Sequence, residues 1–147
     1  MADIGFNPPG LRHDRVVAGL ATEAGIIFGD LLIQDTATVN DHRAAKRTAI
    51  AGGGPVKGVC VSQMGPSGGS LGDSLEVCDE GIVEINLVPL QAVVKGDILI
   101  ASTTAGAVKV LAAEALAWQV GIADMDMAAQ AGVVRISCRL QINKRAA

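Results

Sequence analysis

The segment Val133-Val134-Arg135-Ile136-Ser137-Cys138-Arg139-Leu140-Gln141-Ile142 decides the class of the fold. Every second side chain, beginning at Val134, is apolar, and only Val133 interrupts the polar side chains between them. Successive side chains of a strand point to opposite faces of the sheet, so this pattern is typical of a half-buried β-strand. We therefore predict a strand over 132–142 with an apolar inner face.

The composition of the rest of the chain favours the same class. Half of the 147 residues are hydrophobic and 18% are charged, which is the composition of a folded chain of single-domain size. The only aromatic residues are Phe6, Phe28 and Trp118, and small branched side chains of this kind pack well on a pleated sheet. The 18 glycines and 5 prolines indicate frequent turns. We expect an all-β, mainly strand-and-turn domain.

A short phrase recurs along the chain. Gly29-Asp30-Leu31-Leu32-Ile33 returns as Gly96-Asp97-Ile98-Leu99-Ile100, and Gly72-Asp73-Ser74-Leu75-Glu76-Val77 is a weaker copy. In each copy a Gly-Asp turn precedes a strand, because glycine adopts positive φ freely and aspartate bonds to the nearby backbone. We predict a duplicated β-motif of about 60 residues per unit, in one closed or rolled sheet.

Strands are expected at 16–20, 25–34, 56–63, 74–78, 81–88, 97–102, 107–111, 117–123 and 132–142. Ala112-Ala113-Glu114-Ala115-Leu116-Ala117 is the best helix candidate, although it is short for a stable helix. We divide the chain into an extended N-terminal arm, residues 1–15, and a single β domain, residues 16–147.

The arm has its own chemistry. Asn7-Pro8-Pro9-Gly10 disfavours a helix, because proline fixes φ and removes a backbone donor. One interpretation is an arm that docks on a partner, and the other is a frayed terminus. The docking hypothesis names these contact residues: Phe6, Pro8, Pro9, Leu11, Arg12, His13 and Arg15.

The charge distribution argues against nucleic acid as a partner. Twelve basic and fifteen acidic residues give a net charge of −3, and few aromatic side chains are present to stack on bases. Basic residues gather at 12–15, 43–47 and 135–145, and acidic residues at 73–84. These runs are either solvated faces or complementary patches used in assembly.

The sequence gives no sign of a membrane or secretory route. It has neither an apolar run long enough to cross a bilayer nor an N-terminal signal peptide. Cys60, Cys78 and Cys138 are odd in number and widely spaced, which favours buried thiols in a reducing compartment. We expect synthesis in a cytoplasm.

Two patterns are superficially catalytic. Gly65-Pro66-Ser67-Gly68-Gly69 has the letters of a nucleophile elbow, but glycines follow Ser67 where a helix should begin. Both histidines, His13 and His42, also precede this serine, which is the wrong order for that fold. Cys60 lies in an apolar strand phrase, where burial makes a thiol inert. We expect no catalytic residue and no enzyme activity.

Patterns for metal and phosphate binding are also incomplete. Asp124-Met125-Asp126 begins like a calcium loop but lacks its later acidic ligands. The run Gly52-Gly53-Gly54-Pro55-Val56-Lys57 lacks the Gly-Lys-Ser/Thr of a phosphate-binding loop. We expect neither a metal site nor a cofactor.

Between Val16 and Ile142 the chain resembles the small head decoration, or cement, proteins that tailed bacteriophages encode beside the major capsid protein. The stretches that carry the resemblance are Gly29-Asp30-Leu31-Leu32, Val56-Lys57-Gly58-Val59-Cys60, Lys95-Gly96-Asp97-Ile98-Leu99, Trp118-Gln119-Val120-Gly121-Ile122-Ala123 and Gly132-Val133-Val134-Arg135-Ile136. The resemblance implies a compact β-barrel-like or tulip-like fold. It further implies a homotrimer that binds the major capsid protein on the outer surface of the assembled head.

Two other classes of function stay open. One is a non-viral trimeric β-scaffold or binding module, and the other is a small hydrolase that uses Ser67. A carrier module would need an exposed lysine at a hairpin tip, whereas Lys57 and Lys95 precede expected strands.

Overall fold

The computed structural model describes residues 11–37, 41–63, 67–132 and 134–142. Its strands are β1 (Arg12–Ala21), β2 (Leu31–Gln34), β3 (Ala44–Arg47), β4 (Val56–Cys60), β5 (Ser74–Leu87), β6 (Ile98–Ala101), β7 (Val108–Val110), β8 (Gln119–Ala123) and β9 (Val134–Leu140). The described residues contain no helix, and so none long and apolar enough to span a membrane. The prediction of an all-β protein is confirmed.

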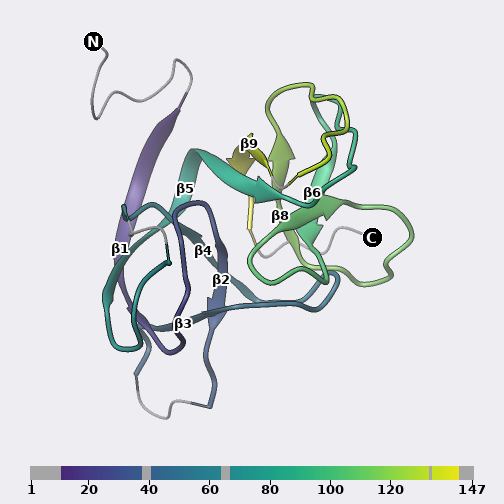
Figure 1. Ribbon diagram of the computed structural model, residues 1–147. Helices are drawn as coiled ribbons and strands as arrows, with labels where there is room; N and C mark the ends of the chain where they lie inside the picture. Colours follow the sequence, from purple (N-terminus) through teal and green to yellow (C-terminus); the bar gives the residue numbers. More distant parts are fainter. Residues whose placement is uncertain (1–10, 38–40, 64–66, 133, 143–147) are drawn as a thin grey trace.

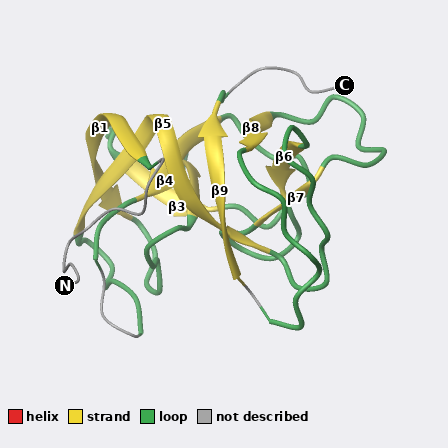
Figure 2. Ribbon diagram, turned by 90° about the horizontal axis from the view of Figure 1, so that it is seen from above, coloured by secondary structure: helices red, strands yellow, loops and turns green. Residues whose placement is uncertain are grey.

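The strands close into two rings that share β5 (Figure 1). The first ring runs β1-β3-β2-β4-β5 and closes where β5 pairs with β1. The second runs β5-β7-β6-β8-β9 and closes where β9 returns to β5. Seen from above, β9 lies between β5 and β8, with which it pairs (Figure 2). Closure of this kind leaves few unpaired strand edges.

The shared strand β5 is 14 residues long and bends at a glycine. Its first half pairs with β1 and β4, and its second half with β9 and β7. Gly81 has φ 130°, and a Cβ at this position would overlap the carbonyl oxygen of Arg12. Sequence reasoning split this strand into 74–78 and 81–88, but the glycine bends the strand without ending it.

The two rings repeat one pairing scheme. Each contains one parallel contact, β1 with β3 and β5 with β7, and its other pairings are antiparallel. The bulge between β2 and β4 falls at Leu32/Ile33, and that between β6 and β8 at the repeated positions Leu99/Ile100. The duplicated motif expected from the sequence is present in the fold.

The repeated Gly-Asp phrase forms the same turn in all three copies. Oδ2 of Asp30, Asp73 and Asp97 accepts the backbone N–H three residues earlier, at 2.9, 2.7 and 2.9 Å. The preceding glycines all have positive φ, between 89° and 100°. The aspartate carboxylate therefore holds the turn while the glycine supplies the backbone angle.

The apolar core divides into two clusters, of which the larger contains residues of both rings. The larger cluster includes Val83, Ile85, Leu99 and Ile136, and the smaller one lies in the first ring around Leu32 and Val77. Along β9 the side chains alternate between the core and the surface from Val134 to Leu140, as the sequence predicted.

Several expected elements differ from the structure. Residues 112–117 form a loop instead of a helix, and Leu116 in this loop has a φ of 57°. The strand expected at 25–34 begins only at Leu31, because Gly25 and Gly29 hold turns at positive φ. Strand β3 was not predicted.

The first strand begins earlier than the sequence predicted, within the expected N-terminal arm. β1 begins at Arg12, so residues 12–15 are strand, whereas sequence reasoning began this strand at Val16. Two register shifts on either side of Arg15 interrupt the pairing with β5, which hides the strand period in the sequence. Residues 1–10 of the expected arm lie outside the described residues.

Candidate functional site

A buried polar pair lies where the two rings meet. Asp30 and Asn86 are 4% and 5% exposed, and Asn86 donates from Nδ2 to Oδ1 of Asp30 at 2.9 Å. The backbone N–H of Ile27 donates to the other carboxylate oxygen at 2.9 Å. Burial raises the pKa of Asp30, and these hydrogen bonds only partly offset it. The pair joins the turn before β2 to β5.

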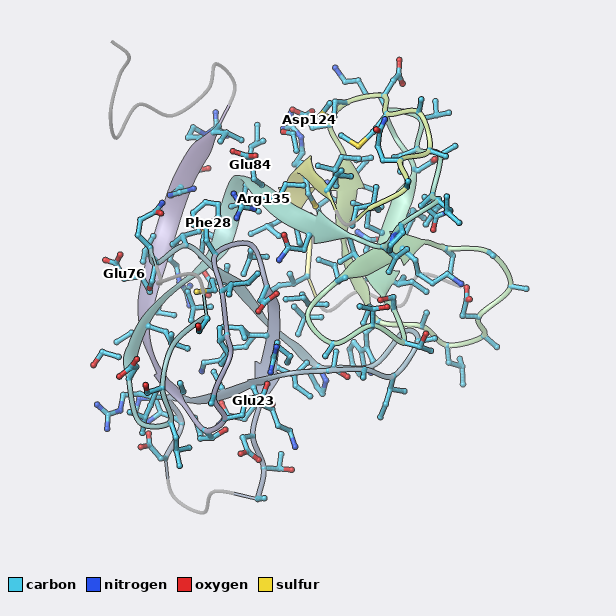
Figure 3. All side chains as sticks on the ribbon, in the orientation of Figure 1. Glu23, Phe28, Glu76, Glu84, Asp124 and Arg135 are labelled. Atoms are coloured by element: carbon cyan, nitrogen blue, oxygen red, sulfur yellow. The ribbon has the colours of Figure 1, made fainter. Side chains whose placement is uncertain are left out.

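A hollow of about 590 Å³ opens beside this pair, lined by Ile27, Glu84, Asn86, Val134 and Arg135. The guanidinium of Arg135 lies 4.8 Å from the centroid of the Phe28 ring, so the ring helps to hold the cation in place. Figure 3 shows Phe28, Glu84 and Arg135 close together at this point. Neither Glu84 nor Arg135 has an ion-pair partner among the described residues. The hollow can bind a complementary polar group.

A groove of about 380 Å³, with both polar and apolar lining, lies where the β3–β4 loop crosses to the second ring. The N–H of Gly52 donates to the carbonyl of Ala101 at 2.9 Å, and the N–H of Trp118 donates to the carbonyl of Gly52 at 3.0 Å. Its lining residues are Ile33, Thr48, Ile50, Ala51, Gly52, Gly53, Gly54, Ala115, Leu116, Ala117 and Trp118. The glycines allow this close approach, since a Cβ on Gly52 would lie 2.8 Å from that of Ala117.

Two large apolar side chains stand at the rim of the groove. Ile50 is 70% exposed and Leu116 is 68% exposed. A leucine with positive φ is uncommon, because the left-handed region is sterically unfavourable for side chains with a Cβ. Exposed apolar surface around a groove marks a site for a protein partner better than a site for polar chemistry.

The contact residues expected in the arm fall into two groups. Phe6, Pro8 and Pro9 lie outside the described residues. Leu11, Arg12, His13 and Arg15 lie in or directly before β1. Arg12 pairs with Asp14 at 2.9 Å, and Arg15 pairs with Asp79 at 3.1 Å.

Each basic run of the sequence has an acidic neighbour within the fold, and for the first run this neighbour is the acidic run 73–84. β1 carries the first basic run and pairs along the acidic part of β5, where Arg15 lies opposite Glu80. In the second basic run, Arg47 pairs with Glu23 at 2.9 Å. In the third, Arg139 lies 3.8 Å from Asp124. Much of the complementary charge is therefore already used within the chain.

The superficially catalytic residues Ser67 and Cys60 lie in a turn and at the end of β4, respectively. Ser67 is exposed in a turn, and no hydrogen bond joins it to a histidine in the described part of the chain. Cys60, Cys78 and Cys138 are buried free thiols. Burial raises the pKa of each thiol, that of Cys138 to about 12.

Residues of the incomplete metal and phosphate patterns form hydrogen bonds within the chain. Asp126 accepts a hydrogen bond from the N–H of Lys95 at 2.8 Å. Nζ of Lys57 donates to the carbonyl of His42 at 2.8 Å and does not face the Gly52–Gly54 run as a phosphate ligand would. Within the described ranges no three His, Cys, Asp or Glu side chains gather in a way that could hold a metal ion.

Sequence reasoning missed the residues of both hollows. Phe28, Asn86 and Arg135 come from three separate segments, and the groove joins residues 48–54 to 115–118. The one available signal was Ile50, an apolar residue between the strands expected at 25–34 and 56–63, where an apolar side chain lacks a core to fill.

Comparison with known proteins identifies the fold alone. No known protein family matches the sequence, and no curated protein is similar to it. Among solved structures, the chain is similar to the N base of the head fiber protein gp8.5 of bacteriophage phi29, with a TM-score of 0.55 and 13% sequence identity. The match covers 86% of this chain and 98% of the phage protein chain. The likeness therefore extends over nearly the whole fold.

Proposed function

We propose that this protein is a structural component of a bacteriophage head, where it binds the outer surface of the assembled shell as a homotrimer and stabilises it. The observation that carries the proposal is the shared fold with the head fiber base of phage phi29 over 86% of the chain. The sequence stretches that resemble head decoration proteins, among them Gly96-Asp97-Ile98-Leu99, point to the same class independently.

The surface supports a binding role. Ile50, Leu71 and Leu116 are large apolar side chains that each expose more than two thirds of their surface. A partner that covers such side chains gains the free energy of removing them from water. In this proposal the chain has no catalytic role, and its partners are the major capsid protein and further copies of itself.

A trimer fits the demands of a shell-binding protein. Three linked copies engage three equivalent sites at once, so strong overall binding does not require strong binding by each copy. The arm residues Phe6, Pro8, Pro9 and Leu11 would add contacts beyond the rings. Arg12 and Arg15 already pair with Asp14 and Asp79, so we expect salt to weaken binding only modestly.

The proposal is tested by co-sedimentation with heads of a phage that encodes this chain, prepared from a strain in which its gene is deleted. We expect saturable binding in multiples of three copies, and light scattering of the free protein should give the mass of a trimer. Absence of binding to these heads at high micromolar protein, with a correctly folded sample, would overturn the proposal.

A further inference from the structure

The groove between the rings has features of a peptide-binding site. Trp118 lines it, Ile50 and Leu116 stand at its rim, and Gly52, Gly53 and Gly54 leave its floor without side chains. Leu116 projects from a backbone with φ 57°, a conformation that its own side chain disfavours.

The sequence contains a segment of matching chemistry. Grooves lined by an aromatic side chain accept proline-rich segments, whose restricted φ angles reduce the entropy lost on binding. Phe6-Asn7-Pro8-Pro9 is such a segment, and it contains two of the five prolines and one of the two phenylalanines of the chain. No comparable apolar, proline-containing stretch is found at the other end, where Asn143-Lys144-Arg145 is polar and basic.

We propose that residues 1–10 of one copy of this protein dock in the Trp118 groove of a second copy. β1 begins on the outer side of the first ring, whereas β8, which directly follows Trp118, belongs to the second ring (Figure 1). Ten extended residues reach at most about 36 Å, a length suited to bridging neighbouring copies. The inference rests on the proposed homo-oligomer, and it identifies the contact between the arm of one copy and the groove of the next as the one that holds the oligomer together.

This contact suits three-fold closure. Donor segment and acceptor groove are different surfaces, so the contact runs head to tail from copy to copy. A head-to-tail contact closes into a ring when the rotation between copies permits it. Each copy then gives one arm and receives one, and the exposed Ile50 and Leu116 are covered in every groove.

Trp118 provides a direct readout because it is the only tryptophan of the chain. The acceptor protein lacks residues 2–10 and keeps Trp118. The donor is the full-length chain with Trp118→Phe, which contributes no tryptophan emission. We expect the emission of the acceptor to shift to the blue and to saturate as donor is added, because the arm removes the indole from water.

Substitutions in the acceptor and in the donor make the test specific. Leu116→Asp in the acceptor should abolish the shift, whereas Leu90→Asp should preserve it. Leu90 is a matched control, since it is 75% exposed and has a φ of 61° but does not line the groove. Aspartate tolerates positive φ better than leucine does, so both variants should fold. On the donor side, Pro8→Ser with Pro9→Ser should weaken the response.

Three results would overturn the inference. One is a donor that causes no shift although full-length protein forms oligomers at the same concentration. Another is an equal shift from a donor that itself lacks residues 2–10. The third is a blue-shifted emission of full-length protein that persists unchanged on dilution to monomer, which would mean that the arm docks on its own chain. None of these three results concerns binding to phage heads, which the co-sedimentation experiment measures separately. The arm contact can therefore be disproved without disproving the proposed function.

Discussion

The side-chain amide of Asn86, on β5, donates a hydrogen bond to Oδ1 of Asp30 across 2.9 Å, at the point where the two rings join. Both side chains are almost fully buried. Asp30 also holds the turn before β2, so one carboxylate serves a local turn and a contact between segments 56 residues apart. Asp97, its counterpart in the repeat, holds only the turn.

This difference predicts unequal effects of the same substitution. Asp30→Ala takes the acceptor from the part-buried N–H of Ile27 and leaves Nδ2 of Asn86 only its longer bond, 3.4 Å, to the carbonyl of Phe28. The loss of such an acceptor costs about 1–3 kcal/mol. Asp97→Ala removes one exposed hydrogen bond and should cost about 1 kcal/mol or less. The free energies of unfolding in urea measure both. Equal losses in the two variants would show that the contact between the rings adds nothing.

The raised pKa of Asp30 predicts a specific dependence on pH. A carboxylate whose folded pKa lies above its unfolded value, ordinarily 3.8, contributes stability that is complete below the unfolded pKa. This stability is lost as the pH rises through the folded pKa. Wild-type protein should therefore lose stability relative to Asp30→Asn as the pH rises from the unfolded pKa through the raised folded pKa of Asp30.

The comparison with Asp30→Asn removes other titrating groups from the result. Glu23 and Asp41 have lowered pKa values, with Arg47 and Arg43 respectively as their lowering partners, and they act in the opposite direction. Because both proteins contain these groups, the difference between their unfolding free energies isolates Asp30. Parallel stability curves across this pH range would contradict the assignment.

Close strand contacts predict a second pair of unequal effects. A Cβ on Gly121 would overlap the carbonyl oxygen of Arg139 and lie 2.6 Å from Sγ of Cys138, whereas Gly132 has nothing within 4 Å. Gly121→Ala should lose about 1–3 kcal/mol of stability through overpacking, and Gly132→Ala should change it by less than about 0.5 kcal/mol. Thermal unfolding of the two variants tests this. A neutral Gly121→Ala would mean that β8 and β9 are farther apart than the structure shows.

The three thiols should be unreactive in the folded protein. Cys60, Cys78 and Cys138 are buried, and burial raises the pKa of each. Iodoacetamide requires the thiolate, so labelling at neutral pH should be slow until the chain is unfolded. Intact-mass spectrometry with and without urea measures the number of labelled sites. Rapid labelling of a native cysteine would show an exposed thiol.

Sequence patterns predicted the parts of the fold that depend on local chemistry. The alternation along β9 and the Gly-Asp turns are set by neighbouring residues, so both could be read directly. Strand β3 could not, because Ala44-Ala45-Lys46-Arg47 has weak strand propensity and forms a strand only through pairing with β1 and β2. Tertiary contacts likewise keep residues 112–117 out of a helix despite their alanines.

The candidate sites were beyond the reach of sequence patterns. The Trp118 groove brings together two loops about 60 residues apart, and neither contains a chemical signature. The stacking of Arg135 on Phe28 depends on how the second ring is placed against the first. Such sites follow from the closure of the rings, which no local pattern encodes.

The central claim is a place on the outside of a phage head, and difference imaging tests it most directly. Heads of a phage that encodes this chain, purified without the protein, are compared by electron cryomicroscopy before and after its addition. The account predicts new density on the outer surface, in clusters of three, each fitting the two-ring fold with its shared β5. Density confined to the interior, or identical maps at saturating protein, would contradict it.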